Sequence, residues 1–131
     1  MKVLLAATAL IELGAGVALL AVPSLAVRLL FASLLDAPAA VALGRLAGAA
    51  LFSLGVACWL ARGDAPSRAA RGLTTAMLCY NLAAVGVLSI AGVGIKTVGV
   101  ALWPVVILHA AMTVWCLACL RRGPLAQSSK P

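Results

Sequence analysis

Four long apolar stretches dominate the sequence, at residues 3–22, 39–61, 71–91 and 99–120. Each is close to the ~20 residues that a helix needs to cross the hydrocarbon core of a membrane. None shows the alternation of apolar and polar residues that a membrane strand requires, and a bilayer admits only helices or closed barrels. The pattern therefore predicts an all-α, polytopic membrane protein whose four transmembrane helices form an antiparallel bundle.

The segments between these stretches differ in character. Residues 23–38 are mostly apolar with few charges, which predicts a short interfacial helix between the first and second spans. Residues 62–70 form a polar, basic turn, and 92–98 form a glycine-rich turn. We expect a single transmembrane domain over residues 1–122 and a short polar cytoplasmic tail at 123–131. The first apolar run, about 20 residues long, exceeds the usual core of a cleavable signal, so we expect it to be retained.

Composition supports a membrane location. The chain of 131 residues is 65% hydrophobic and only 10% charged, whereas a soluble domain is about half apolar and a quarter charged. Its net charge of +7 comes from basic residues that lie mostly at segment ends, where they act as topology signals and contact anionic lipids. A nucleic-acid partner is not expected, because no basic groove is interleaved with aromatic residues.

The basic residues also predict the orientation. Lys96 and Arg28 fall on one side of the membrane. The other side, which carries both termini, collects seven: Lys2, Arg62, Arg68, Arg71, Arg121, Arg122 and Lys130. By the positive-inside rule, this asymmetry predicts a multi-pass protein of the cell inner membrane with both its N- and C-termini in the cytoplasm.

Each predicted span carries a polar side chain inside its apolar run. These are Glu12, Arg45, Asn81 with Tyr80 beside it, and His109. At ~1.5 Å per residue, Glu12, Asn81 and His109 lie near the middle of the membrane, and Arg45 is about 10 Å from the outer end of its span. The matching depths predict an ion pair between Glu12 and Arg45, with Asn81 and His109 supplying hydrogen bonds.

This polar set has two interpretations. The side chains either hold the helices together, as polar groups in membrane bundles do, or surround a cavity that binds a ligand or a proton. Trp103, followed by Pro104, begins the fourth span at the outer interface. The candidates for ligand or proton binding are Glu12, Arg45, Tyr80, Asn81, Trp103 and His109. No catalytic residue and no cofactor follows from the pattern.

Small residues in the second span predict close helix packing. Gly44 and Gly48 are four residues apart, a spacing that lets two backbones approach each other. The partner is either another helix of the same bundle or a second copy of the chain. We favour the bundle.

Four cysteines, Cys58, Cys79, Cys116 and Cys119, fall in the predicted cytoplasmic halves of the spans. Disulfides are not expected on that reducing side. A four-cysteine metal site is conceivable, but small apolar packing residues explain these positions better.

With these residues in view, the sequence resembles the small bacterial four-helix membrane proteins grouped around DoxX. The resemblance covers nearly all of the hydrophobic part and rests on Glu12-x-x-x-Gly16 running to Pro23, Gly44-Arg45-x-x-Gly48, Tyr80-Asn81, and Trp103-Pro104 followed by His109. It implies a four-helix bundle that often works as an accessory to membrane redox or biosynthetic complexes. It supplies no catalytic residues.

Three functions are compatible with the sequence. The first is an accessory or scaffold subunit whose polar set ties the bundle together, with a membrane protein or a second copy of the chain as partner. The second is a proton-coupled carrier or a receptor for a small lipophilic ligand. The third is a membrane enzyme acting on a lipid or quinone, with His109 and Glu12 as acid and base. In each case membrane lipids surround the chain.

Overall fold

The computed structural model describes residues 1–94 and 98–122, and in these residues all regular structure is helical. The predicted tail at 123–131 and the position of Lys96 lie outside the described residues. The helices are α1 (Lys2–Ala21), α2 (Pro23–Phe31), α3 (Pro38–Ala61), the 3₁₀ turn η1 (Arg62–Asp64), α4 (Arg68–Gly94) and α5 (Leu102–Arg121). Helices α1, α3, α4 and α5 are each long and apolar enough to cross a membrane, which confirms the four long apolar helices that the sequence predicts.

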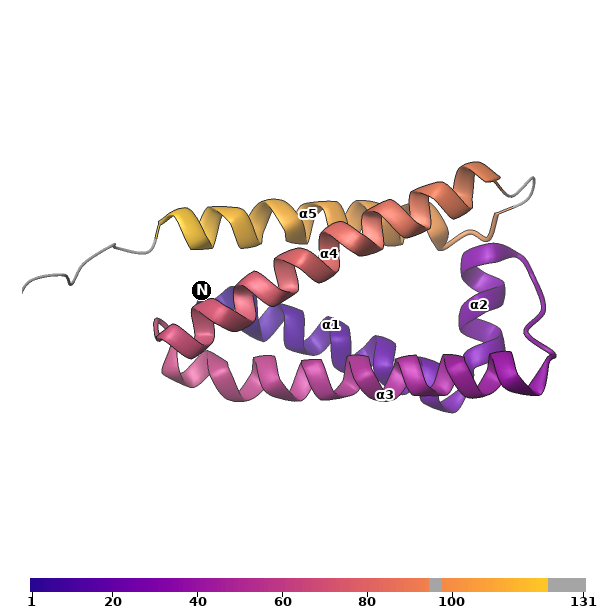
Figure 1. The fold of residues 1–131 in the computed structure, drawn as a ribbon, viewed down its shortest axis with the longest axis horizontal. Coiled ribbons are helices and arrows are strands. Elements are labelled where there is room, and N and C mark those ends of the chain that lie inside the picture. Colours follow the sequence, from indigo (N-terminus) through magenta and orange to yellow (C-terminus); the bar gives the residue numbers. More distant parts are fainter. Residues whose placement is uncertain (95–97, 123–131) are drawn as a thin grey trace, which may run out of the picture.

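Helices α1 and α3 form one closely packed antiparallel pair (Figure 1). Glycines make the contact possible. A Cβ atom added at Gly16 of α1 would lie 2.6 Å from the backbone nitrogen of Phe52 and 2.8 Å from the carbonyl oxygen of Gly48. One at Gly48 would lie 2.8 Å from the backbone nitrogen of Leu20. Gly48 therefore packs within the bundle, as predicted.

Helices α4 and α5 form the second antiparallel pair, and α4 runs obliquely from the end of α3 to the start of α5 (Figure 1). Its first turn lies near the end of α3, and its last turns lie beside the start of α5. Gly92 permits this second approach, because a Cβ atom there would lie 2.7 Å from the Leu102 side chain. At the opposite end, the guanidinium of Arg71 donates a hydrogen bond of 3.4 Å to the Leu120 carbonyl.

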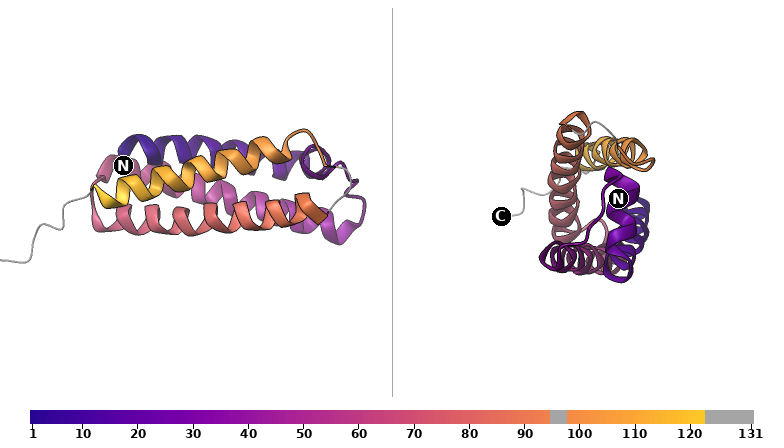
Figure 2. Two further views of the ribbon diagram at one scale, coloured as in Figure 1. Left: turned by 90° about the horizontal axis from the view of Figure 1, so that it is seen from above. Right: turned by 90° about the vertical axis from the view of Figure 1, so that its right-hand side faces the viewer.

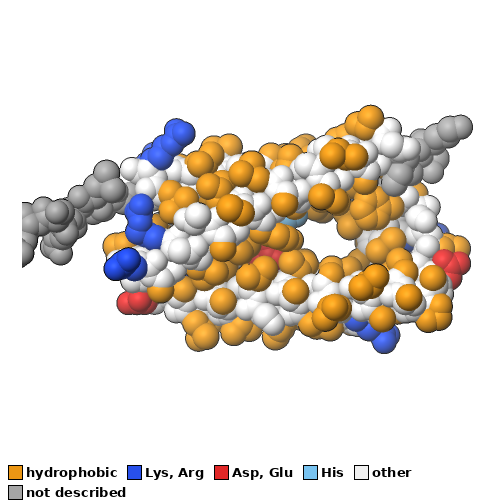
Figure 3. Space-filling model, in the orientation of Figure 1, with side chains coloured by type: hydrophobic (Ala, Val, Ile, Leu, Met, Phe, Trp, Pro, Cys, Tyr) orange, Lys and Arg blue, Asp and Glu red, His pale blue; other side chains and the backbone are white. Residues whose placement is uncertain are grey.

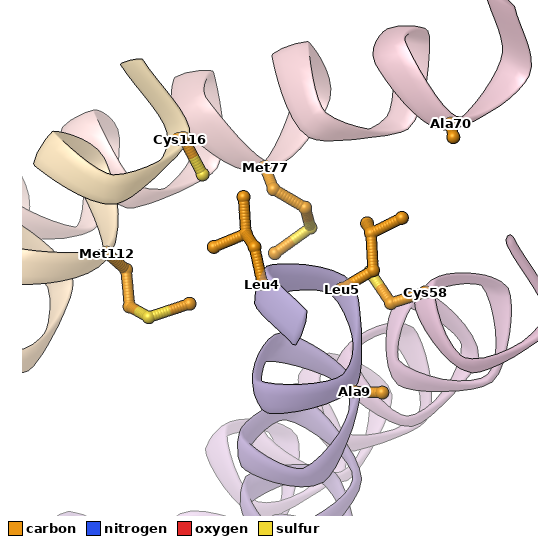
Figure 4. Packing of buried hydrophobic residues seen from close by; sticks show 8 residues of the cluster. All are labelled: Leu4, Leu5, Ala9, Cys58, Ala70, Met77, Met112 and Cys116. Atoms are coloured by element: carbon orange, nitrogen blue, oxygen red, sulfur yellow. The ribbon is translucent and has the colours of Figure 1, made fainter. Parts of the chain in front are cut away.

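The two pairs meet in one apolar cluster near the N-terminus (Figure 4). Its buried members come from α1, α3, α4 and α5: Leu4, Leu5, Ala9, Cys58, Ala70, Met77, Met112 and Cys116. Leu4 and Leu5 are both 1% exposed and insert between the pairs from the first turns of α1. This end of the bundle is consequently closed.

At the other end the pairs separate, and α2 lies across the space between them (Figures 1 and 2). Pro23 begins α2, since its fixed φ and missing N–H suit a first helical position. The backbone N–H groups of Gly99 and Ala101 donate hydrogen bonds of 3.0 Å to the carbonyls of Leu30 and Leu29. The short helix predicted between the first two spans is therefore present, and it joins the α1–α3 pair to the start of α5.

The outer surface has the polarity expected of a protein surrounded by lipid. Hydrophobic side chains cover the flank in Figure 3, and most of the basic side chains visible there lie at the end where α4 begins and α5 ends. Large exposed side chains on this surface include Val93 (82% exposed) and Leu60 (72%). Such extensive apolar exposure is stable only if lipid or another protein covers it.

Candidate functional site: a central cavity

A cavity of about 550 Å³ lies between the two helix pairs, where they separate. This size falls within the range of small-molecule sites, roughly 300–1,000 Å³. Figure 3 shows the molecule hollowed on this flank, between α4 and α3. All five α-helices line the cavity, through Ile11, Glu12, Ala15, Ala18, Leu19, Ala26, Leu29, Leu30, Leu51, Tyr80, Ala83, Ala84, Val87, Leu88, Ala101, Val105, Leu108 and His109.

Only three of these lining residues have polar side chains: Glu12, Tyr80 and His109. Glu12 is 3% exposed, and its carboxyl has no hydrogen-bond or ion-pair partner within residues 1–94 and 98–122. A buried carboxyl without a partner is costly. Its presence on the wall of a cavity is therefore a feature that packing alone does not explain.

A short hydrogen-bond chain fixes the orientation of His109. The amide nitrogen of Asn81 donates to the Met77 carbonyl at 2.7 Å, so its amide oxygen faces the histidine. That oxygen lies 2.7 Å from Nδ1 of His109 and accepts a hydrogen bond from it. In the neutral imidazole the proton is then on Nδ1, which leaves Nε2 as an acceptor for a group in the cavity.

Tyr80 completes the polar part of the wall. Its ring meets the His109 ring edge to face, with centroids 5.6 Å apart and an angle of 83° between the planes. This geometry is favourable for aromatic pairs. Tyr80 and Asn81 are adjacent on α4 and both contact His109: the Tyr80 ring meets the imidazole ring, and the Asn81 amide oxygen accepts the hydrogen bond from Nδ1.

The Asn81–His109 contact predicts energetic coupling between α4 and α5. In a double-mutant cycle of Asn81→Leu, His109→Leu and the double variant, we expect a coupling free energy of about 0.6–1.7 kcal/mol, the range of interhelical hydrogen bonds in membranes. Each single variant leaves one buried polar group without its partner, whereas the double variant leaves neither. Reversible unfolding in bicelles measures these free energies. Strictly additive losses would contradict the hydrogen bond.

The predicted ion pair between Glu12 and Arg45 is wrong. Arg45 is exposed on α3, and the described part of the chain contains no salt bridge to Glu12. The cause is the rotation of α3 about its axis. Leu51 lines the cavity, and Arg45, six residues earlier, points about 120° away at 100° per residue. The α1-facing glycines, Gly48 and Gly55, lie between these two directions.

Two other candidate groups also lie away from the cavity. Trp103 is 45% exposed at the start of α5, near Gly92 of α4, and does not line the cavity. The four cysteines do not form one site: Cys58 and Cys116 pack in the buried cluster and Cys119 packs against it, whereas Cys79 is exposed. No group of three or more metal-binding side chains occurs among the described residues.

Several residues of the site were not anticipated from the sequence. Small side chains provide the space: Ala15, Ala18, Ala26, Ala83, Ala84 and Ala101 all line the cavity. Helical spacing in the sequence does indicate the lining residues of α1 and α4. Ala15 and Leu19 lie on the same face as Glu12, and Ala83 and Ala84 lie on the same face as Tyr80. Thr8, one turn before Glu12, is a further buried polar residue, and its hydroxyl has no partner in the described structure.

Comparisons of this chain with models of protein families, with curated proteins and with solved structures found no match. The resemblance to the DoxX group therefore stays a prediction, and the functional argument rests on the cavity and the residues that line it.

Proposed function

We propose that this protein is a membrane-embedded receptor for a small lipophilic ligand, which it binds in the central cavity. The observation that carries the proposal is the combination of about 550 Å³ of space with walls that are apolar except for Glu12, Tyr80 and His109. An apolar pocket with a few convergent polar groups is the usual form of a small-molecule site. The apolar walls would hold the body of the ligand, and the three polar groups would orient its head.

Both ends of the cavity are blocked, which suggests that a ligand would enter from the side. The buried cluster blocks the cavity toward the N-terminal end, and Leu29 and Leu30 of α2 form its wall at the other end. The hollow instead reaches the lipid-facing flank (Figure 3). A lipophilic molecule concentrates in the bilayer, so entry from the membrane between the helix pairs needs no aqueous route.

The location and orientation of the protein belong to the same proposal. Seven basic residues are predicted on the side of the membrane that carries both termini. They support an inner-membrane location with both termini in the cytoplasm. The cavity then lies in the outer half of the membrane, from the level of Glu12 to α2. An accessory role in a larger membrane complex, as the DoxX resemblance implies, is compatible with such a receptor.

An enzyme acting on a lipid or quinone is the second candidate. One observation favours it: Glu12 and His109 line the same cavity, so an acid and a base face one space. Binding of a lipophilic molecule precedes any such reaction, and the test of binding therefore comes first.

Filling the cavity tests the proposal. We expect Ala84→Phe to weaken binding of a neutral lipophilic probe, naphthylethanol, by about tenfold or more, which is ~1.4 kcal/mol. The added ring occupies space that the probe requires. Equilibrium dialysis against the protein in phosphatidylcholine nanodiscs, with empty nanodiscs subtracted, measures this binding. The matched control is Ala110→Phe on α5, an exposed alanine about 100° around the helix from His109 and outside the cavity lining, which should bind as the wild type does. Equal binding by all three proteins would contradict the proposal.

A further inference from the structure

The three polar groups of the cavity differ in what they can offer to a ligand. Glu12 offers carboxyl oxygens, and His109 offers the acceptor Nε2, because its Nδ1 is already engaged by Asn81. Tyr80 offers the face and edge of an aromatic ring as well as its hydroxyl. Two of the three groups are therefore suited to a hydrogen-bond donor, and the third has a ring face that attracts cations.

The distribution of charged residues around the cavity also favours a positively charged ligand. No lysine or arginine is among the residues that line it. Arg45, which lies well inside its predicted span and not at a span end as Arg71 does, is exposed on α3 and points away from the cavity. A carboxylate in this setting has no counter-charge of its own. Its attraction for an incoming cation is stronger in a medium of low dielectric constant than in water, and this attraction offsets the cost of removing both charges from water.

From this arrangement we infer that the ligand of the cavity is a lipophilic amine, whose ammonium group pairs with the Glu12 carboxylate and donates to Nε2 of His109. This inference deepens the proposed receptor function and rests on it. The apolar walls, to which all five α-helices contribute, would take the hydrocarbon body. A ligand whose head can only accept hydrogen bonds, such as a simple ketone, matches this set poorly, because His109 presents an acceptor.

The test compares three probes that share one apolar body and differ only in the head: naphthylethylamine, naphthylethanol and naphthylacetate. Binding is measured by equilibrium dialysis against the full-length protein in phosphatidylcholine nanodiscs, with empty nanodiscs subtracted for partitioning. We expect the amine to bind about tenfold to a hundredfold more tightly than the alcohol, as for hydrogen bonds to charged groups, and the acid to bind most weakly.

Glu12→Gln is the matched variant, because it keeps the size of the side chain and removes its charge. We expect the preference for the amine over the alcohol to fall to about onefold, while an unchanged helical circular dichroism spectrum in nanodiscs shows that the variant is folded. A preference that persists in Glu12→Gln would also overturn the amine inference. Equal binding of amine and alcohol by the wild type, or tightest binding of the acid, would overturn the amine inference and leave the receptor function standing. Binding of none of the three probes would overturn both.

Discussion

Replacing Gly16 by alanine is expected to destabilise the protein by about 1–3 kcal/mol or more, the usual cost of overpacking a tight contact. The new methyl group would lie 2.6 Å from the Phe52 nitrogen and 2.8 Å from the Gly48 oxygen. Both atoms belong to the backbone of α3, so no side-chain rotation can make room. Helices α1 and α3 must separate instead, and the pair that forms one wall of the cavity is lost. Reversible unfolding in bicelles measures the change.

The same helix provides the control. Gly14 has no neighbouring atom within 4 Å of an added Cβ. In Gly14→Ala only the higher helix propensity of alanine acts, so we expect unchanged stability or a gain of up to about 1 kcal/mol. The two substitutions are identical in chemistry and two residues apart, yet only Gly16→Ala should lower the stability. Equal effects would show that α1 and α3 do not approach each other at Gly16.

Gly99→Ala is expected to release α2 from the start of α5. A Cβ atom at this buried position would overlap the Leu29 carbonyl group. Avoiding the overlap breaks the hydrogen bonds from Gly99 to Leu30 and from Ala101 to Leu29. At about 1 kcal/mol for each bond, together with the steric cost, the loss should exceed about 2 kcal/mol. Because Leu29 and Leu30 line the cavity, binding of naphthylethanol should weaken as well.

Gly94→Ala, at the C-terminal end of α4, is the control for Gly99→Ala. An added Cβ atom at Gly94 meets nothing within 4 Å, so neither stability nor probe binding should change by a measurable amount. If Gly99→Ala lowered stability but left probe binding intact, α2 would contribute to the stability of the fold and not to the binding site.

The spanning helices could be predicted because their length and apolar character are properties of single segments. Asn81 and His109 were expected to supply hydrogen bonds to the polar set, because residue counts put them at matching depths. That they bond to each other was not predicted. Depth follows directly from residue count. The direction in which a side chain points does not, and this is why the Arg45 prediction failed: the contacts of Gly48 and Gly55 with α1 set the rotation of α3.

The cavity itself could not be predicted, because it depends on the relative placement of whole helices. Two closely packed pairs meet at Leu4 and Leu5 and separate beyond them, and α2 holds them apart at the far end. In the sequence, Ala15 and Ala84 look like any other alanines in a chain that is rich in them. Only their position beside Glu12 and Tyr80 makes them part of a binding site.

The most direct test of the cavity as the binding site is to locate a bound ligand on the chain. With alanine methyl groups isotopically labelled and the protein in nanodiscs of deuterated lipid, intermolecular nuclear Overhauser effects locate naphthylethanol on the chain. We predict contacts from its ring protons to the methyl groups of Ala15 and Ala84, which line the cavity. Contacts confined to Ala42 and Ala110, which are exposed and point away from the cavity-lining residues of α3 and α5, would contradict the central cavity as the binding site.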